Sequence, residues 1–279
     1  FVDRLGLRAS RMNLGFGVKF TNTQIVVNHK DFFPASEEVM YLSGAPLHVL
    51  AVEGVRRFRS HFGDRFPISF SAGIDRQNFP DAVAIGLVPV TVCSDLLKAG
   101  GYSRAEAYLR RLAQRMEAVA ARTIDDFILL AYGYAEAALE RATDDVDLRS
   151  RCKKALEENA PLEKAAGEAL YARWKSEAIL LGTEHYAAQV RVNPRYTAAR
   201  NSKSPRKLDS TLVLLDCISC DKCVPVCPNN ANFTYTLPLG EIPVERLEFK
   251  AAGPSVHTDP PLRVEQGHQL ANYVDFCND

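Results

Sequence analysis

Short apolar runs alternate with amphipathic segments over the first hundred residues of the chain. Three runs bounded by Gly, Pro, Asn or Asp are predicted strands: Phe16–Phe20, Pro67–Ser71 and Pro89–Cys93. Leu47–Phe62 has apolar residues three and four positions apart and is a predicted helix, with arginines 56, 57 and 59 on its opposite side. Gln77–Ile85 is a second predicted helix, because Gly86 suits the position just after a helix end. This alternation predicts an α/β fold with buried parallel strands.

Residues 103–201 are predicted to be helical throughout, because Ala, Leu, Glu and Arg dominate there. Ser103 with Glu106 and Thr123 with Asp126 have the spacing of capping boxes. Four helices of ordinary length are expected, and breaks are predicted near Arg122, Asp144, Asn159–Pro161 and Gly182. The many charged residues of this stretch are interpreted as solvated helix faces.

A polar stretch with a proline, residues 201–207, precedes the cysteine-rich part of the chain and is the predicted domain boundary. Predicted strands flank the cysteines at Thr211–Leu215 and Asn232–Leu237, and residues 238–267 are expected to form an extended or hairpin insertion. The chain is therefore divided into an α/β part at residues 1–102, a helical connector at 103–205 and an α+β domain at 206–279.

The composition narrows the classes of partner and compartment. Lys plus Arg equals Asp plus Glu at 34 each, so no long-range field favours nucleic acid, and we expect none as a partner. The longest apolar stretches, such as Phe127–Tyr132, are far shorter than the ~20 residues that cross a bilayer, so no membrane segment is expected. The cysteines are clustered rather than scattered in pairs, which favours a reducing compartment, the cytoplasm.

Four cysteines carry the strongest chemical signal in the chain. They fit the C-x2-C-x2-C-x3-C-P spacing of bacterial ferredoxins: Cys217, Cys220, Cys223 and Cys227, followed by Pro228. In two-cluster proteins of this kind the first three thiolates bind one [4Fe–4S] cluster and the fourth binds the other. A structural zinc site is the weaker alternative, since it needs two cysteine pairs or a pair with histidine, and His257 is the nearest histidine in sequence.

Cys277 stands where a second motif of the same spacing would begin. We interpret it as a further cluster ligand and expect the rest of that motif beyond residue 279, so that two clusters belong to the full-length protein. The alternative is a lone cysteine of the core or surface. Cys93, at the end of an apolar strand, is interpreted as a small core residue, and Cys152 receives no catalytic role.

The turns after the second and third predicted strands resemble those of flavin-binding TIM barrels. In barrels related to dihydropyrimidine and dihydroorotate dehydrogenases, a Gly-Ile turn and a following Ser-containing turn hold the FMN phosphate, and a strand lysine reaches the flavin. The matching positions here are Lys19, Gly73, Ile74 and Ser94. The resemblance implies the C-terminal part of a TIM barrel that binds FMN, and the alternative is an α/β sheet whose turns contain Gly and Ser without a flavin.

Three segments together resemble one family: Phe66–Asp81, Pro89–Leu97 and Cys217–Asn232. They are similar to the large iron–sulfur flavoproteins described as selenate reductase subunits, relatives of dihydropyrimidine dehydrogenase. This resemblance covers most of the chain. It implies a bacterial-ferredoxin-like domain at 206–279, truncated in its second motif, with FAD and NAD(P)H sites and the first half of the barrel outside this chain. The acid–base residue would also lie outside it, so no catalytic residue is named.

The leading hypothesis is an oxidoreductase segment that relays single electrons through [4Fe–4S] clusters to a small-molecule oxidant. Its partners would be other redox subunits or the remainder of its parent chain. A second hypothesis is an FMN-dependent barrel that reduces a pyrimidine- or purine-like ring and is fed by the clusters. A non-enzymatic alternative is a scaffold in which the clusters are structural.

Overall fold

The computed structural model describes residues 1–21, 23–28, 38–96, 101–202, 223–227, 231–250, 253–264 and 267–272. The chain divides into two compact units, residues 1–205 and residues 206–279. The three-part division predicted from the sequence, with bounds at 102 and 205, stays a prediction. The two units are described separately.

Three short parallel strand segments lie side by side in the first unit. β1 (Val18–Phe20) pairs in parallel with β4 (Ile68–Phe70), and Phe70 forms a parallel bridge to Val90. Each predicted strand therefore contains a paired segment, and the parallel arrangement is confirmed. Apolar side chains of all three contact the main core, and Ile68 and Phe70 are fully buried.

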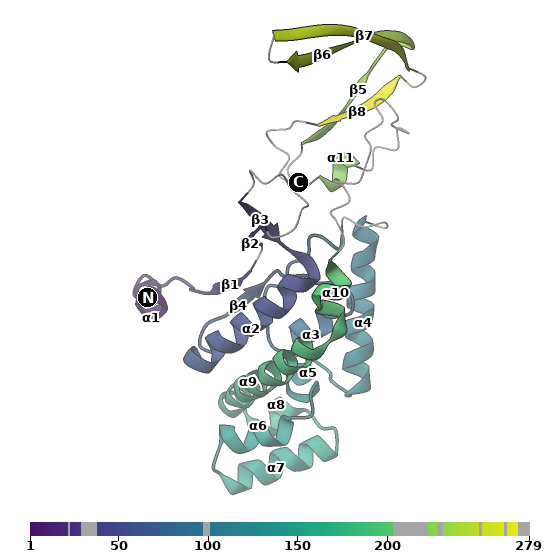
Figure 1. Cartoon of the computed structure of the whole chain (residues 1–279). Coiled ribbons are helices and arrows are strands. Elements are labelled where there is room, and N and C mark those ends of the chain that lie inside the picture. The colour runs from purple at the N-terminus through teal and green to yellow at the C-terminus, as the bar shows by residue number, and fades with distance from the viewer. Residues whose placement is uncertain are drawn as a thin grey trace. The chain divides into compact units, whose positions relative to one another are not determined.

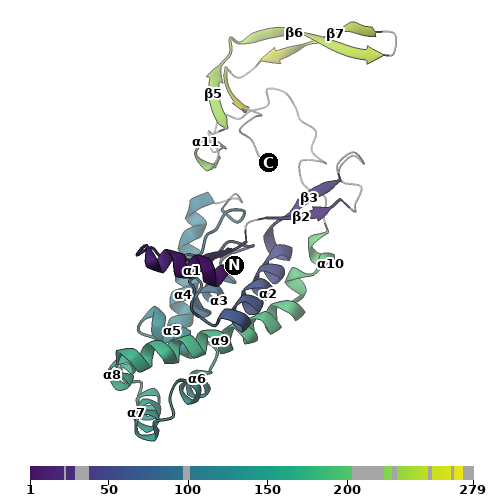
Figure 2. The same ribbon diagram turned by 90° about the vertical axis from the view of Figure 1, so that its left-hand side faces the viewer.

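Helices cover one side of these strands. α2 (Gly44–Phe62) contains the predicted helix 47–62, and α3 (Phe79–Ala84) lies within the predicted helix 77–85. The long helix α9 (Glu168–Val192) runs along α2 (Figures 1 and 2). Leu47, Val55 and Tyr186 belong to one buried cluster, so helices far apart in sequence share the core of the strands.

The region predicted to be helical is helical where the structure describes it. It holds α4 (Ala105–Ala118), α5 (Ile124–Leu130), α6 (Ala135–Ala142), α7 (Val146–Glu157), α8 (Leu162–Ala166) and α9. The breaks near residues 122, 144 and 159–161 are confirmed. The prediction of four helices is wrong, because residues 101–202 contain more than four, of lengths from 4 residues in α10 to 25 in α9.

The break predicted at Gly182 is also wrong, since Gly182 lies inside α9. A Cβ at this position would lie 3.1 Å from the ring of Tyr132, so the glycine admits a neighbouring side chain rather than ending the helix. The Thr123 cap is confirmed, because its hydroxyl accepts the Asp126 amide at 3.0 Å. Ser103 is not the cap of α4; it lies in the preceding 3-10 turn η1 (Gly101–Arg104).

Several elements were not predicted from the sequence. They are α1 (Val2–Arg11) and the antiparallel pair β2 (Gln24–Val27) and β3 (Val39–Leu42). The 3-10 turn η2 (Pro194–Tyr196) and α10 (Ala198–Asn201) lie within the stretch predicted to be helical. α6 to α9 enclose a second core around Trp174, whose indole N–H donates to the Ala135 carbonyl at 2.7 Å. In the described parts of the chain, no helix combines the length and apolarity that bilayer crossing requires.

The described residues of the second unit form two antiparallel strand pairs and one helical turn. The helical turn α11 (Cys223–Val226) precedes β5 (Asn232–Thr236), which pairs with β8 (His268–Asn272). Between them, β6 (Gly240–Lys250) and β7 (Gly253–Val264) form a hairpin. The predicted strand at 232–237 and the hairpin insertion are confirmed, and the predicted strand at 211–215 lies outside the described residues.

Arg59 corrects one prediction about α2. The sequence places it on the solvent side, yet its side chain is only 2% exposed. Its guanidinium donates to the Ile85 carbonyl at 2.6 Å and to the Thr183 hydroxyl at 2.7 Å. Arg59 thereby joins α2 to the end of α3 and to α9. The spacing of apolar residues in the sequence does not reveal these contacts.

We expect Arg59→Met to lower the free energy of unfolding by about 2–4 kcal/mol, because it leaves buried acceptors without their donor. Arg57→Met, on the same helix with a side chain 76% exposed, is the matched control and should change it by less than about 0.5 kcal/mol. Urea denaturation of both variants checks this. Equal effects would mean that the buried guanidinium does not tie the three elements together.

Candidate functional site

The carboxyl ends of the parallel strands form one edge of the first unit. Because β1, β4 and the Val90 segment run in the same direction, the loops that follow them meet there. Ligand sites of α/β proteins form at such edges. The structure therefore brings the segments that contain Lys19, Gly73, Ile74 and Ser94 to one edge.

Lys19 lies on the strand face that points away from the helices. Val18 and Phe20 pack on the core, and side chains alternate along a strand, so Lys19 faces the other way and is exposed. It pairs in register with Ser69, and Thr91, after the third strand, is also exposed. The open face of the strands is therefore polar and carries one lysine next to hydroxyl groups.

Gly73 and Ile74 have packing roles at this edge. Gly73 has φ +56°, and a Cβ there would overlap the Gly44 carbonyl oxygen at the start of α2. The carbonyl of Gly73 accepts the Asn78 side-chain amide at 2.9 Å, and Ile74 is 4% exposed within the core. Backbone packing and this hydrogen bond therefore hold the turn in one conformation without a ligand.

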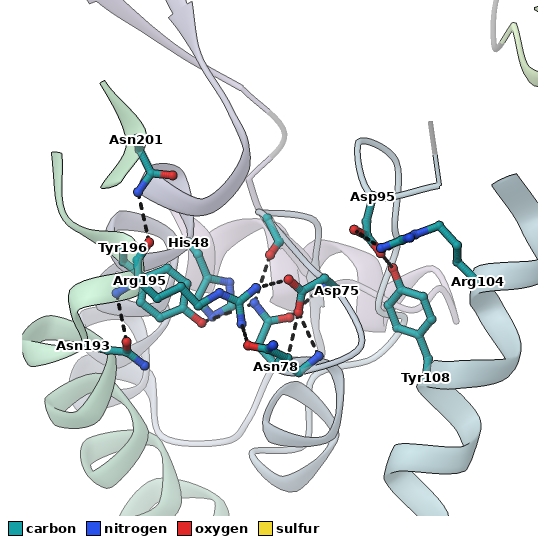
Figure 3. A network of polar contacts seen from close by, with 12 residues as sticks. His48, Asp75, Asn78, Asp95, Arg104, Tyr108, Asn193, Arg195, Tyr196 and Asn201 are labelled. Carbon is teal, nitrogen blue, oxygen red and sulfur yellow. Dashed lines mark hydrogen bonds and ion pairs between the residues drawn. The ribbon is translucent and has the colours of Figure 1, made fainter. Parts of the chain in front are cut away.

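The loop that contains Ser94 is fixed by its neighbour Asp95. Asp95 is 4% exposed and accepts from Arg104 at 2.9 Å and from the Tyr108 hydroxyl at 2.5 Å (Figure 3). Ser94 itself is exposed. The prediction that Cys93 is a core residue is wrong, because Cys93 is exposed while the adjacent Val92 packs on the core.

A buried histidine of α2, His48, holds the turn after β4 through a hydrogen bond to its backbone. His48 is fully buried, and its Nδ1 lies 2.7 Å from the Ala72 carbonyl oxygen. A carbonyl oxygen only accepts, so Nδ1 carries the proton and Nε2 accepts from the Tyr186 hydroxyl, also at 2.7 Å. Burial lowers the pKa of His48 to about 4, so the ring is neutral near pH 7.

Tyr196 and Arg195 extend this network to the end of the helical region (Figure 3). The ring of Tyr196 stacks on His48 with centroids 5.0 Å apart. Arg195 forms an ion pair with Asp75 and donates to the Gln77 side chain at 2.8 Å. Asp75 also accepts the Gln77 amide at 2.8 Å, so the turn before α3 is held from both sides.

Two of the predicted cluster ligands lie in described parts of the second unit. Cys223 begins α11 and Cys227 follows it, and both side chains are partly buried. The Ala231 amide donates to Cys227 Sγ at 3.2 Å, the kind of N–H···S contact that cluster thiolates accept. The Asn232 side chain donates to the Cys223 carbonyl at 3.2 Å. This loop therefore fits a thiolate-bound cluster chemically.

The other predicted ligands, Cys217, Cys220 and Cys277, lie outside the described residues. Among the residues that are described, no three His, Cys, Asp or Glu side chains gather as a metal site. The cluster assignment of these cysteines therefore stays a prediction. Cys152 is buried in α7, where burial raises the pKa of its thiol, so it has the setting of an inert core residue.

Residues 1–145 match the family described as "Oxidoreductase YgfK, N-terminal TIM-barrel domain". The chain belongs to this family. The proteins named "Putative oxidoreductase YgfK" from Escherichia coli K12 and O157:H7 are each 39% identical over 111 residues, 40% of this chain. That region spans 11% of the length of these relatives. No solved structure gives a significant match.

The family supports an oxidoreductase and a TIM-barrel fold for the first unit. Its description names an N-terminal barrel domain, whereas the sequence predicted the C-terminal part of a barrel, so that narrower assignment is not supported. The selenate reductase resemblance and the ferredoxin-type domain lie beyond what the matches show.

Sequence reasoning missed the side chains that hold the edge in place. His48 stands among apolar residues in the first half of α2, and Arg195 lies 120 residues from Asp75. Neither has a local motif, and only the packing of α9 against α2 reveals their partners. Asp95 had a weak signal, as an acidic residue directly after an apolar run.

Protonation of His48 should make stability depend on pH. Between pH 6.5 and about 4 the unfolded chain binds a proton at this ring and the folded chain does not, so the free energy of unfolding falls as pH decreases. The loss amounts to about 3 kcal/mol and ends near pH 4. His48→Gln, which keeps a donor and an acceptor, should lack this component in pH-dependent denaturation, whereas His61→Gln, an exposed control on α2, should keep it. Identical profiles for wild type and His48→Gln would contradict the assignment.

Proposed function

We propose that this chain is part of an iron–sulfur oxidoreductase in which residues 206–279 relay single electrons through [4Fe–4S] clusters. The observation that carries the proposal is the spacing of Cys217, Cys220, Cys223 and Cys227 ahead of Pro228. Membership of an oxidoreductase family supports it. Such clusters accept and release one electron at a time.

The residues of the chain would have distinct roles in this relay. Cys217, Cys220 and Cys223 would bind one cluster, and Cys227 and Cys277 would reach the other. The Ala231 amide would stabilise negative charge on Cys227 Sγ and so raise the reduction potential of its cluster. Partly buried positions for Cys223 and Cys227 would limit water around the sulfurs.

A second candidate function rests on the polar strand face of the first unit. We propose that Lys19, with Ser69 beside it and Thr91 two strands away on the same face, faces an FMN ring, and that the turns at Gly73–Ile74 and Ser94 hold its phosphate. Lys19 is exposed, so the core does not require a lysine there and its cation can reach a ligand. Electrons from the clusters would then reach a pyrimidine- or purine-like ring bound at this edge.

The whole protein's substrate and partners follow from this proposal. A small-molecule oxidant, of which selenate is one example, would receive the electrons. Reducing equivalents would come from FAD and NAD(P)H sites in the remainder of the parent chain or in other redox subunits. Neither nucleic acid nor a membrane enters this scheme.

Anaerobic reconstitution of the full-length protein tests the relay. We expect about eight irons per chain and a spectrum of interacting reduced clusters in electron paramagnetic resonance. Cys223→Ser should lose about four irons, and Cys93→Ser, an exposed cysteine outside the motif, should lose none. Zinc in place of iron would overturn the proposal. Clusters that the enzyme's reductant fails to reduce would instead indicate a structural scaffold.

The flavin proposal has its own test, in the flavin content of the purified protein. Lys19→Met should lower the flavin bound per chain by about fivefold or more, because it removes a cation beside the ring. Lys164→Met, a change of equal charge at an exposed position of α8, is the matched control. Equal flavin content in both variants, or none in the wild type, would contradict FMN binding.

A further inference from the structure

A basic groove lies on the first unit, apart from the residues assigned to FMN. Its volume is about 360 Å³, within the range of small-molecule sites. It is lined by Arg76, Gln77, Ala107, Arg110, Arg111 and Gln114. Lys19, Gly73, Ile74 and Ser94 are not among them, although Arg76 and Gln77 follow Gly73 and Ile74 in the same turn.

Two rigid elements form its walls. Ala107, Arg110, Arg111 and Gln114 are spaced as one face of α4. Arg76 and Gln77 come from the turn between β4 and α3, which Asp75, Asn78 and Arg195 hold in place (Figure 3). The backbone positions from which these side chains extend are therefore fixed before any ligand binds.

The residues that line the groove are mainly hydrogen-bond donors. No Asp or Glu lines it within the part of the chain that the structure describes. Arg110 forms an ion pair with Glu106, which is 77% exposed. The Gln77 side-chain oxygen already accepts from Arg195, which leaves its NH2 group as a donor.

We propose that this groove binds a small phosphorylated molecule through Arg76, Arg110 and Arg111. Three guanidinium groups around one hollow repel each other, and a bound dianion relieves that repulsion. Arginine matches phosphate oxygens with two parallel N–H donors, so several arginines can hold a diphosphate by its separate phosphoryl groups. A neutral ligand would compensate the charge of neither Arg76 nor Arg111, whereas Arg110 is already paired with Glu106.

Inorganic pyrophosphate is the probe, and isothermal titration of the full-length protein is the measurement. We expect a dissociation constant below about 1 mM that rises with added sodium chloride. Arg76→Gln and Arg111→Gln should each weaken binding by about fivefold or more, with an unchanged circular dichroism spectrum because both side chains are exposed.

Arg173→Gln is the control, since it removes the same charge at an exposed position of α9 outside the groove. No binding by the wild type, or equal weakening in all three variants, would overturn the proposal. Because the readout involves neither iron nor flavin, its failure is separate from failure of the proposed electron relay.

Discussion

The packing of α9 against α2 is the constraint on which the first unit depends, and two buried polar side chains fix it. Arg59 joins α2 to Ile85 and to Thr183 of α9. Eleven residues earlier, His48 joins α2 to Ala72 and to Tyr186 of α9. Apolar contacts alone would let two helices slide by a turn, whereas each of these bonds is satisfied in one register only. Removing either donor also leaves a buried acceptor without a partner, so both contacts stabilise the same arrangement.

The packing of α2 and α9 fixes the positions of the turns at the carboxyl ends of the strands. The His48 contact ends at the Ala72 carbonyl, one residue before Gly73, and Arg195 reaches Asp75 from the end of the helical region. The helical residues therefore form part of the support of the strand ends. A substitution in α9 that shifts this helix would also shift the turn after β4. No residue of α9 is among those predicted to touch a cofactor.

The sequence predicts the elements of this fold better than the contacts that fix them. Parallel strands, α2 and the β6–β7 hairpin follow from apolar spacing and turn residues, which are local signals. Arg59 and Gly182 were misread because their reasons lie across the fold: Arg59 meets acceptors on other helices, and Gly182 admits the ring of Tyr132. The cysteine spacing is the opposite case, since a single loop supplies successive ligands and the motif is readable from sequence alone.

The residues assigned to FMN differ in how strongly they indicate a ligand, because the fold itself requires some of them. Gly73 satisfies a left-handed backbone and a close approach to Gly44, so glycine would be required there in a sheet without any cofactor. Ile74 is likewise explained by the core. Lys19 is exposed, so the packing of the core does not require a lysine at this position. The proposed flavin site at this edge therefore depends more on Lys19 and the Ser69 hydroxyl beside it than on the Gly73 turn.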